Sequence, residues 1–223
     1  MTYGKEIGRK FHEDGSIRHY PGNTCVSDII PGCSAYDVML ELHQMVMDSG
    51  LAKYFIMLPA DSYHMTVIRG LNDQVRTDEF WPANLDKNAT MDQVDDYVSA
   101  AIERAGIPGP VRMKFATVNI SASCCTIGLV PADESQAQLL KEFRDRAADE
   151  IGLRLPRHDN YRFHISLGYM HYVAEGEDAV KMEALKEKMN AHIANQPEFY
   201  TTPPYMAFYD DMLCFSPTRV PRK

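Results

Sequence analysis

The sequence has little of what marks secreted, membrane-spanning or zinc-binding proteins. Its five cysteines are odd in number, include an adjacent pair and show no Cys-x-x-Cys spacing, so neither a disulfide framework nor a zinc knuckle is predicted. No apolar run approaches the roughly 18 residues of a membrane span, and the first residues hold no apolar signal core. These features predict a cytoplasmic protein with reduced cysteines and no membrane contact.

Positive charge and phosphate-loop glycines are also scarce. Asp and Glu outnumber Lys and Arg by 31 to 23, and the net charge of −8 argues against binding of long duplex nucleic acid. A small nucleotide in a local basic pocket stays possible. No glycine-rich loop stands in a strand-to-helix turn. Over 223 residues, 45% apolar and 24% charged side chains are ordinary globular usage, for one domain or two small lobes.

Helical and strand-like patterns alternate along the chain. Asp14-Gly15 between two short alternating stretches predicts a hairpin over residues 9–20, closed by a turn at 21–23. Runs at 53–58 and 63–69 are joined by four residues, which predicts that they pair antiparallel. Residues 70–90 are expected to form a long loop. Amphipathic spacing predicts helices over 34–49, 92–105, 133–151 and around 182–193, with further strands over 112–120, 124–130, 162–170 and 205–215.

Two of these strands share one pattern. Tyr63-His64-Met65-Thr66-Val67 and Phe163-His164-Ile165-Ser166-Leu167 each read aromatic, His, apolar, hydroxyl, apolar. At the chain's own residue frequencies, chance predicts roughly 0.015 such windows. We therefore interpret the pair as a functional repeat.

The strand period of two fixes which side chains of each motif point together. His64 and Thr66 share one face, and so do His164 and Ser166, while the intervening apolar residues face the core. Each strand also follows an amphipathic helix. The order predicts an α+β protein dominated by antiparallel sheet, and we hypothesise two similar lobes whose pseudo-twofold brings the motifs together.

Two histidines facing each other suit phosphoryl transfer from an RNA-like ester. A neutral imidazole takes the proton of the attacking water or hydroxyl, and a protonated one donates to the leaving oxygen. The two hydroxyls would hydrogen-bond the non-bridging phosphate oxygens. This scheme needs no metal.

The paired motifs resemble those of the 2H phosphoesterase superfamily, which includes cyclic phosphodiesterases and 2′–5′ RNA ligase-like proteins. The longer stretches at 62–67 and 159–167, and the segment 15–24 with its Pro-Gly-Asn-Thr, are similar to those of a little-characterised branch. The resemblance spans residues 10–217. Its catalytic specificity rests on about ten positions.

The resemblance implies a fold, a site and an activity. It implies that residues 1–223 form a single bilobal domain with antiparallel sheets, helices on the outer faces and a central cleft. His64 and His164 would be the catalytic acid/base pair, with Thr66 and Ser166 as phosphate ligands. The implied activity is metal-independent hydrolysis of 2′,3′-cyclic or related phosphodiesters of a small nucleotide or an oligonucleotide end, without a cofactor. Which histidine is the base is not transferable, because it depends on the direction in which the substrate reacts.

Three further residues are candidates for substrate binding. Arg162 lies two residues before His164, and the sequence supports a phosphate contact and a surface salt bridge about equally. Trp81 would either stack on a base or fill the space beneath the long loop, and the second is favoured. Tyr172 is placed near the end of its strand. Tyr63, Phe163 and Tyr169 are expected in the core.

Two other functions stay open at this point. A nucleotide-binding or scaffold module of the same fold would share every motif. A metal oxygenase using histidines from strands is less favoured, since the remaining histidines show no regular metal-ligand spacing.

Overall fold

The computed structural model describes residues 1–219, which form four α-helices and ten strands. The helices are α1 (Ser34–Asp48), α2 (Met91–Ala105), α3 (Glu134–Ile151) and α4 (Glu177–Ile193). The strands are β1 (Thr2–Tyr3), β2 (Gly22–Asp28), β3 (Phe55–Met57), β4 (His64–Asn72), β5 (Arg112–Ile120), β6 (Cys124–Pro131), β7 (His164–Met170), β8 (Tyr172–Val173), β9 (Phe199–Tyr200) and β10 (Tyr205–Tyr209).

One eight-stranded antiparallel sheet runs through the molecule. Its order is β10-β2-β4-β7-β6-β5-β9, with β3 attached to β7, while β1 and β8 make a separate two-stranded sheet. The central neighbours β4 and β7 are the two motif strands, and they pair only through Met65 and Ile165. Beyond this point the two strands diverge, β4 running with β2 and β7 running with β6 and β3. The predicted α+β class with antiparallel pairing is therefore confirmed.

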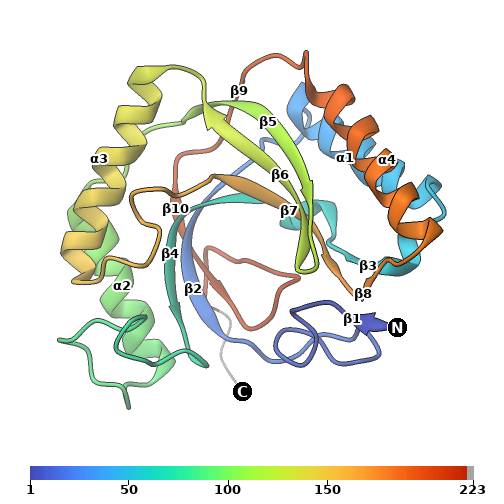
Figure 1. Ribbon diagram of the computed structural model, residues 1–223. Helices are drawn as coiled ribbons and strands as arrows, with labels where there is room; N and C mark the ends of the chain where they lie inside the picture. Colours follow the sequence, from blue (N-terminus) through green and yellow to red (C-terminus); the bar gives the residue numbers. More distant parts are fainter. Residues whose placement is uncertain (220–223) are drawn as a thin grey trace.

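The helices lie in two pairs at opposite sides of the sheet. Figure 1 shows α2 beside α3 on one side and α1 beside α4 on the other. The apolar motif residues Met65, Val67, Ile165 and Leu167 are completely buried, as the strand period of two requires. The histidines and hydroxyls between them stay partly accessible.

Local sequence signals explain where α2 and α3 begin and end. Thr90 and Gln93 form a reciprocal capping box at the start of α2, and the Asp133 carboxylate accepts the Gln136 N–H at the start of α3. Gly152 ends α3 in the left-handed conformation, at φ 72°.

One predicted pairing is wrong. The segment 53–58 supplies β3, which pairs with β7 rather than with β4, and a 3₁₀ turn at Ala60–Ser62 separates β3 from β4. The predicted hairpin over residues 9–20 is present in a short form. Its turn is at Gly15, at φ 83°, and the antiparallel bridge between Phe11 and Ile17 is closed by backbone hydrogen bonds from His12 to Ser16 and from Arg18 to Lys10.

The strand β2 begins where the sequence predicts a turn. Its polar residues are buried, and the Asn23 amide donates to the Asp95 carboxylate on α2 at 2.8 Å. Because Asp95 is 0% exposed, this bond partners one oxygen of a carboxylate that α2 brings into the core, and the Arg219 guanidinium lies 3.8 Å from the other oxygen. A polar strand of this kind lacks the alternation on which sequence reasoning depends.

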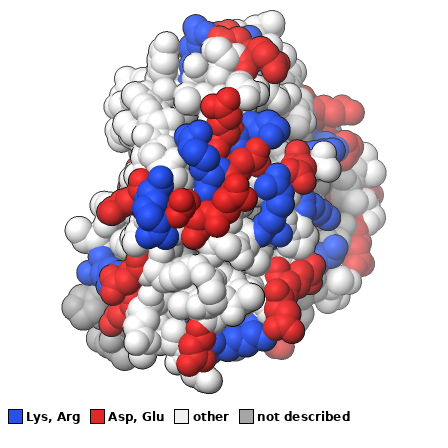
Figure 2. Space-filling model, turned by 90° about the vertical axis from the view of Figure 1, so that its left-hand side faces the viewer, with Lys and Arg blue, Asp and Glu red and all other residues white. Residues whose placement is uncertain are grey.

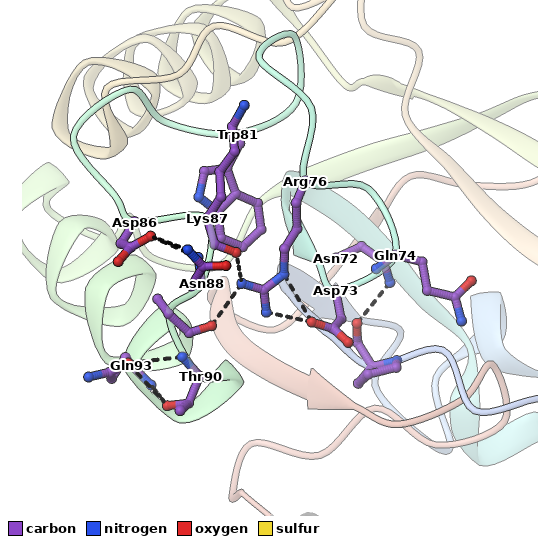
Figure 3. Close-up of polar contacts among 12 residues, drawn as sticks. Asn72, Asp73, Gln74, Arg76, Trp81, Asp86, Lys87, Asn88, Thr90 and Gln93 are labelled. Carbon is purple, nitrogen blue, oxygen red and sulfur yellow. Dashed lines mark hydrogen bonds and ion pairs between the residues drawn. The ribbon is translucent and has the colours of Figure 1, made fainter.

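The expected long loop is present as residues 73–90 and is tied down by Arg76. Figure 3 shows its guanidinium between Asp73 and the carbonyls of Lys87 and Ala89, at 2.5–3.0 Å. The same guanidinium lies 4.6 Å from the centre of the Trp81 ring. These contacts make the loop a fixed part of the fold.

Opposite charges are interleaved over the face formed by α2 and α3 (Figure 2). Lys141 pairs with Asp145, Arg146 with Glu142, and Arg104 with Glu150. Within residues 1–219, no helix combines the length and the apolarity needed to cross a membrane.

Candidate functional site

The crossing of β4 and β7 brings the two motifs onto one face. Antiparallel pairing through Met65 and Ile165 sets His64 across from Ser166, and Thr66 across from His164. Directly opposed Cβ atoms in such a pair are about 4.5–5.5 Å apart, and diagonal ones about 7–8 Å. The four predicted side chains therefore form one compact group, with the histidines on a diagonal.

Both imidazoles are oriented in the same way. The ring Nδ1 of His64 lies 2.8 Å from the Ser62 carbonyl oxygen, and that of His164 lies 2.9 Å from the Arg162 carbonyl oxygen. A carbonyl oxygen only accepts, so each Nδ1 carries the hydrogen. In the neutral rings the Nε2 lone pairs are left for chemistry, on the same pattern in both strands.

His64 lies in the less polar environment of the two. Burial lowers the pKa of His64 to about 4, with a smaller contribution in the same direction from the nearby His164, against the opposing hydrogen bond to Ser62. The Phe215 ring, from the segment after β10, lies 4.2 Å from the His64 ring. His64 is therefore neutral at neutral pH in the free protein.

Neighbouring strands extend the polar face around the four motif residues. Thr126 on β6 lies opposite Ser166, and Gly128 lies opposite His164. A cavity of about 420 Å³ opens beside His164, lined by β5, β6 and residues 161–164. On the other side, Asp28 lies opposite His64 and accepts a hydrogen bond from the Tyr205 hydroxyl at 2.8 Å. The motif face thus borders a space large enough for part of a nucleotide.

The three further candidates fall in different places. Arg162 is exposed and lines the cavity beside His164, without a salt bridge among the described residues. Trp81 is not brought to the histidines: it is 2% exposed, and its indole N–H donates to the Leu85 carbonyl inside the 73–90 loop. Tyr172 is also elsewhere, on β8, where it stacks on Tyr3 at 5.2 Å. Of these three, only Arg162 joins the motif residues.

The three aromatic residues that were expected in the core, Tyr63, Phe163 and Tyr169, differ in how deeply they are buried. Tyr63 is 3% exposed, and its hydroxyl lies 2.8 Å from Nδ1 of His43 on α1, so the expectation for Tyr63 is confirmed. Phe163 is only half-buried and packs edge-on against Tyr161. Tyr169 is 9% exposed and belongs to the hydrophobic core, so the expectation for Tyr169 is also confirmed, although strict strand alternation does not persist as far as Tyr169.

Two β-bulges explain the direction of the Tyr169 side chain and that of Arg69, a residue that the sequence analysis did not identify. The register of β4 against β2 shifts after Thr66, and that of β7 against β6 shifts after Ser166. Each shift inserts one extra residue, so Arg69 and Tyr169 return to the face that carries the motif hydroxyls. Strict alternation would have put both on the core face, and no signal in the sequence marks the two bulges.

Tyr161 is a second residue that was missed. Burial raises the pKa of its phenol, while the nearby Arg144, Arg69 and Thr66 act in the opposite direction. Tyr161 therefore lies close to the motif hydroxyl of β4. It belongs to the irregular segment before β7, where sequence patterns do not fix side-chain directions.

One group of side chains within residues 1–219 has the spacing of metal ligands. Ligand atoms of Asp145, His158 and Asp159 lie within 4.8 Å of one another. The Arg154 guanidinium bridges the two carboxylates at 2.6–2.9 Å, and the Lys141 ammonium lies 2.6 Å from Asp145. Cations of the protein already occupy this group, which we interpret as an ion-pair network.

Comparison with known families identifies the fold family. The model of the family described as "2H-phosphodiest: Domain of unknown function (DUF1868)" matches residues 10–124, just over half of the chain. The chain belongs to this 2H phosphodiesterase family. The matched range contains the His64 motif, and the His164 motif lies beyond it.

Solved structures similar to this 2H family member include one over almost the whole chain. It is the conserved protein of unknown function ATU0111 from Agrobacterium tumefaciens, with 25% identity and a TM-score of 0.85, covering 96% of this chain and 91% of that one. LigT of E. coli complexed with phosphate is 10% identical, with a TM-score of 0.47 over 86% and 88% of the two chains. TT0787 of Thermus thermophilus is 12% identical, with a TM-score of 0.44 over 84% and 86%. A search of curated proteins gave no match.

Proposed function

We propose that the protein is a metal-independent phosphodiesterase that hydrolyses 2′,3′-cyclic or related phosphodiesters of a small nucleotide or an oligonucleotide end. The observation that carries the proposal is the pairing through Met65 and Ile165, which gathers two imidazoles and two hydroxyls on one face. We also propose that the chain forms two lobes that meet where β4 crosses β7. The central cleft would lie on the face that carries the motif histidines and hydroxyls, and the two helix pairs would lie on the outside.

His64 is suited to the role of general base. Its Nε2 lone pair is free because Nδ1–H is held by the Ser62 carbonyl, and its lowered pKa keeps the ring neutral in the free protein. A bound phosphodiester brings a negative charge, which raises the pKa of a nearby imidazole toward the working pH. His64 then takes the proton of the water that attacks phosphorus.

His164 and the two hydroxyls complete the proposed reaction. His164, protonated, gives its Nε2 proton to the 2′ or 3′ oxygen as the P–O bond breaks, so one proton enters and one leaves the pair of rings. Thr66 and Ser166 donate hydrogen bonds to the non-bridging oxygens, where negative charge accumulates. Arg162, beside His164, is proposed to contact the same phosphate.

The test is a panel of nucleoside 2′,3′-cyclic phosphates, ADP-ribose cyclic phosphate and 2′–5′ linked oligomers, assayed in EDTA. We expect turnover of at least one substrate and a loss of about 100-fold or more in kcat/KM for His64→Ala and for His164→Ala. His192→Ala is the matched control, because His192 is a histidine on α4 that bonds Glu41, outside the motif face. Activity that EDTA abolishes, or that survives both motif substitutions, would refute the proposal.

A nucleotide-binding module without turnover is the alternative. The Phe215 ring against His64 favours it, because a covered imidazole is a poor proton acceptor for water. Calorimetric binding of a nucleotide with no product, in the same panel, would support this alternative.

A further inference from the structure

A second cavity lies where β4 separates from β7. It has a volume of about 160 Å³ and is enclosed by β4, α3 and residues 153–161. Arg69, Arg144 and Arg157 line it together with His158 and Tyr161, the remainder is mainly aliphatic, and no Asp or Glu of the described chain contributes. We name it the arginine pocket. Three guanidinium groups without an acid are unexpected in a chain of net charge −8.

Arg144 places a buried cation in the wall of this pocket. Arg144 is 7% exposed, and its guanidinium donates hydrogen bonds to the carbonyls of Val67 and His158. The guanidinium also lies 4.2 Å from the centre of the Tyr161 ring. Within residues 1–219, no carboxylate lies within salt-bridge distance of it. A buried charge without a direct ion-pair partner is costly, and an anion entering the pocket would offset that cost.

Arg69 and Arg157 add accessible guanidinium groups. Arg69 lies 5.2 Å from the Phe80 ring, and neither arginine forms a salt bridge in the described part of the chain. Arg157 has φ 66° and is the one non-glycine residue with positive φ among residues 1–219. Such a backbone conformation is unfavourable for a non-glycine residue and is concentrated at ligand-binding segments.

The acidic groups nearby are already engaged. Asp145 contacts Lys141, Arg154 and His158, and Asp159 contacts Arg154, at 2.6–2.9 Å. Asp145 and Asp159 attract Arg144 from a distance, but neither forms an ion pair with any of the three pocket arginines.

Tyr161 connects the arginine pocket to the proposed reaction site. It lines both this pocket and the cavity of about 420 Å³ beside His164. Arg69 follows Thr66 by three residues on the same strand, a distance of about 10 Å. At 160 Å³ the pocket is smaller than cavities that enclose a whole ligand, about 300–1,000 Å³, so it suits a single anionic group.

We propose that the arginine pocket binds a second phosphate group of the substrate, about 10 Å from the phosphate at His64 and His164. This inference rests on the proposed function for the first phosphate, and it narrows the substrate to nucleotides that carry another phosphate, such as one on the 5′ oxygen. Arg69 and Arg157 bind its oxygens, and Arg144 supplies charge from behind Tyr161.

The experiment compares two product-like ligands by calorimetry, so it needs no turnover. Adenosine 2′,5′-bisphosphate is expected to bind the wild-type protein at least about tenfold more tightly than adenosine 2′-monophosphate, as one additional charge-assisted contact allows. In an Arg69→Gln/Arg157→Gln variant, the ratio of the two affinities is expected to fall to about one.

The control variant is Arg104→Gln, which removes the same charge from the exposed face of α2, where Arg104 pairs with Glu150. It should keep the wild-type ratio. Equal affinities in the wild-type protein, or a preference that persists in the double variant, would overturn the inference. A preference without turnover in the substrate panel contradicts the proposed function alone, whereas turnover without the preference contradicts only the arginine pocket.

Discussion

The contact between Phe215 and His64 predicts a measurable effect on proton binding. The pKa of His64 lies at about 4 instead of 6.5, which corresponds to about 3 kcal/mol against the charged ring. Burial is the main cause, and the Phe215 ring at 4.2 Å is part of the surface that excludes water. Replacing Phe215 by Ala admits water to one face of the imidazole. We expect the pKa of His64 to rise by about one pH unit or more.

The assay is an NMR titration of the histidine ring protons, with His64→Ala used to assign the signal. The lowered pKa of His64 also makes the free energy of unfolding depend on pH. Because the native pKa lies below the unfolded one, the unfolded chain binds the proton first as pH falls from 6.5 toward 4. His64 therefore lowers the stability of the fold progressively as the pH falls from 6.5 to 4. In Phe215→Ala the native pKa is higher, so this pH range should become narrower.

Tyr200→Ala is the control, since Tyr200 is a 54% exposed aromatic residue on β9. Its substitution should leave the His64 titration where it is. A wild-type His64 that titrates near 6.5, or a Phe215→Ala variant with an unchanged midpoint, would refute the account of His64 as a desolvated base.

Two further predictions concern the elements that hold the motifs. Ile165 is completely buried at the strand crossing, so Ile165→Ala should cost about 2–5 kcal/mol in urea unfolding, and a loss under about 1 kcal/mol would mean that the crossing is loosely packed. Asn23→Ala removes the amide donor from the buried Asp95 carboxylate, with an expected cost of about 2–3 kcal/mol. Combining it with Asp95→Asn should recover part of that loss, and no recovery would contradict the charge-based explanation.

Sequence patterns were sufficient to locate a helix or strand when one of its faces is buried and the other is exposed. The helices were found by their apolar stripes, and the two motif strands by alternation, because Met65 and Ile165 pack into the core while the histidines do not. The same alternation placed each histidine beside its hydroxyl. The motif residues were therefore available from sequence before their contacts were known.

The features that could not be predicted from the sequence depend on which strands pair with each other and on irregular backbone. β3 is separated from β4 by a 3₁₀ turn at Ala60–Ser62 and pairs with β7 instead, and the polar strand β2 is held to α2 by the hydrogen bond from Asn23 to Asp95. The bulges that return Arg69 and Tyr169 to the motif face arise between strands distant in sequence. Such features follow from tertiary contacts, so local propensity does not reveal them.

The antiparallel crossing gives a reason why both motifs read in the same order. With His before hydroxyl on each strand, the pairing through Met65 and Ile165 alternates the two groups, so each imidazole lies across from a hydroxyl. The imidazoles then occupy a diagonal of about 7–8 Å between Cβ atoms, which leaves space for one phosphate between them. Exchanging the residues at 64 and 66, by His64→Thr with Thr66→His, would set two imidazoles directly opposite each other. The composition of the face would be unchanged, but the space between the rings would close, and turnover in the substrate panel should be lost.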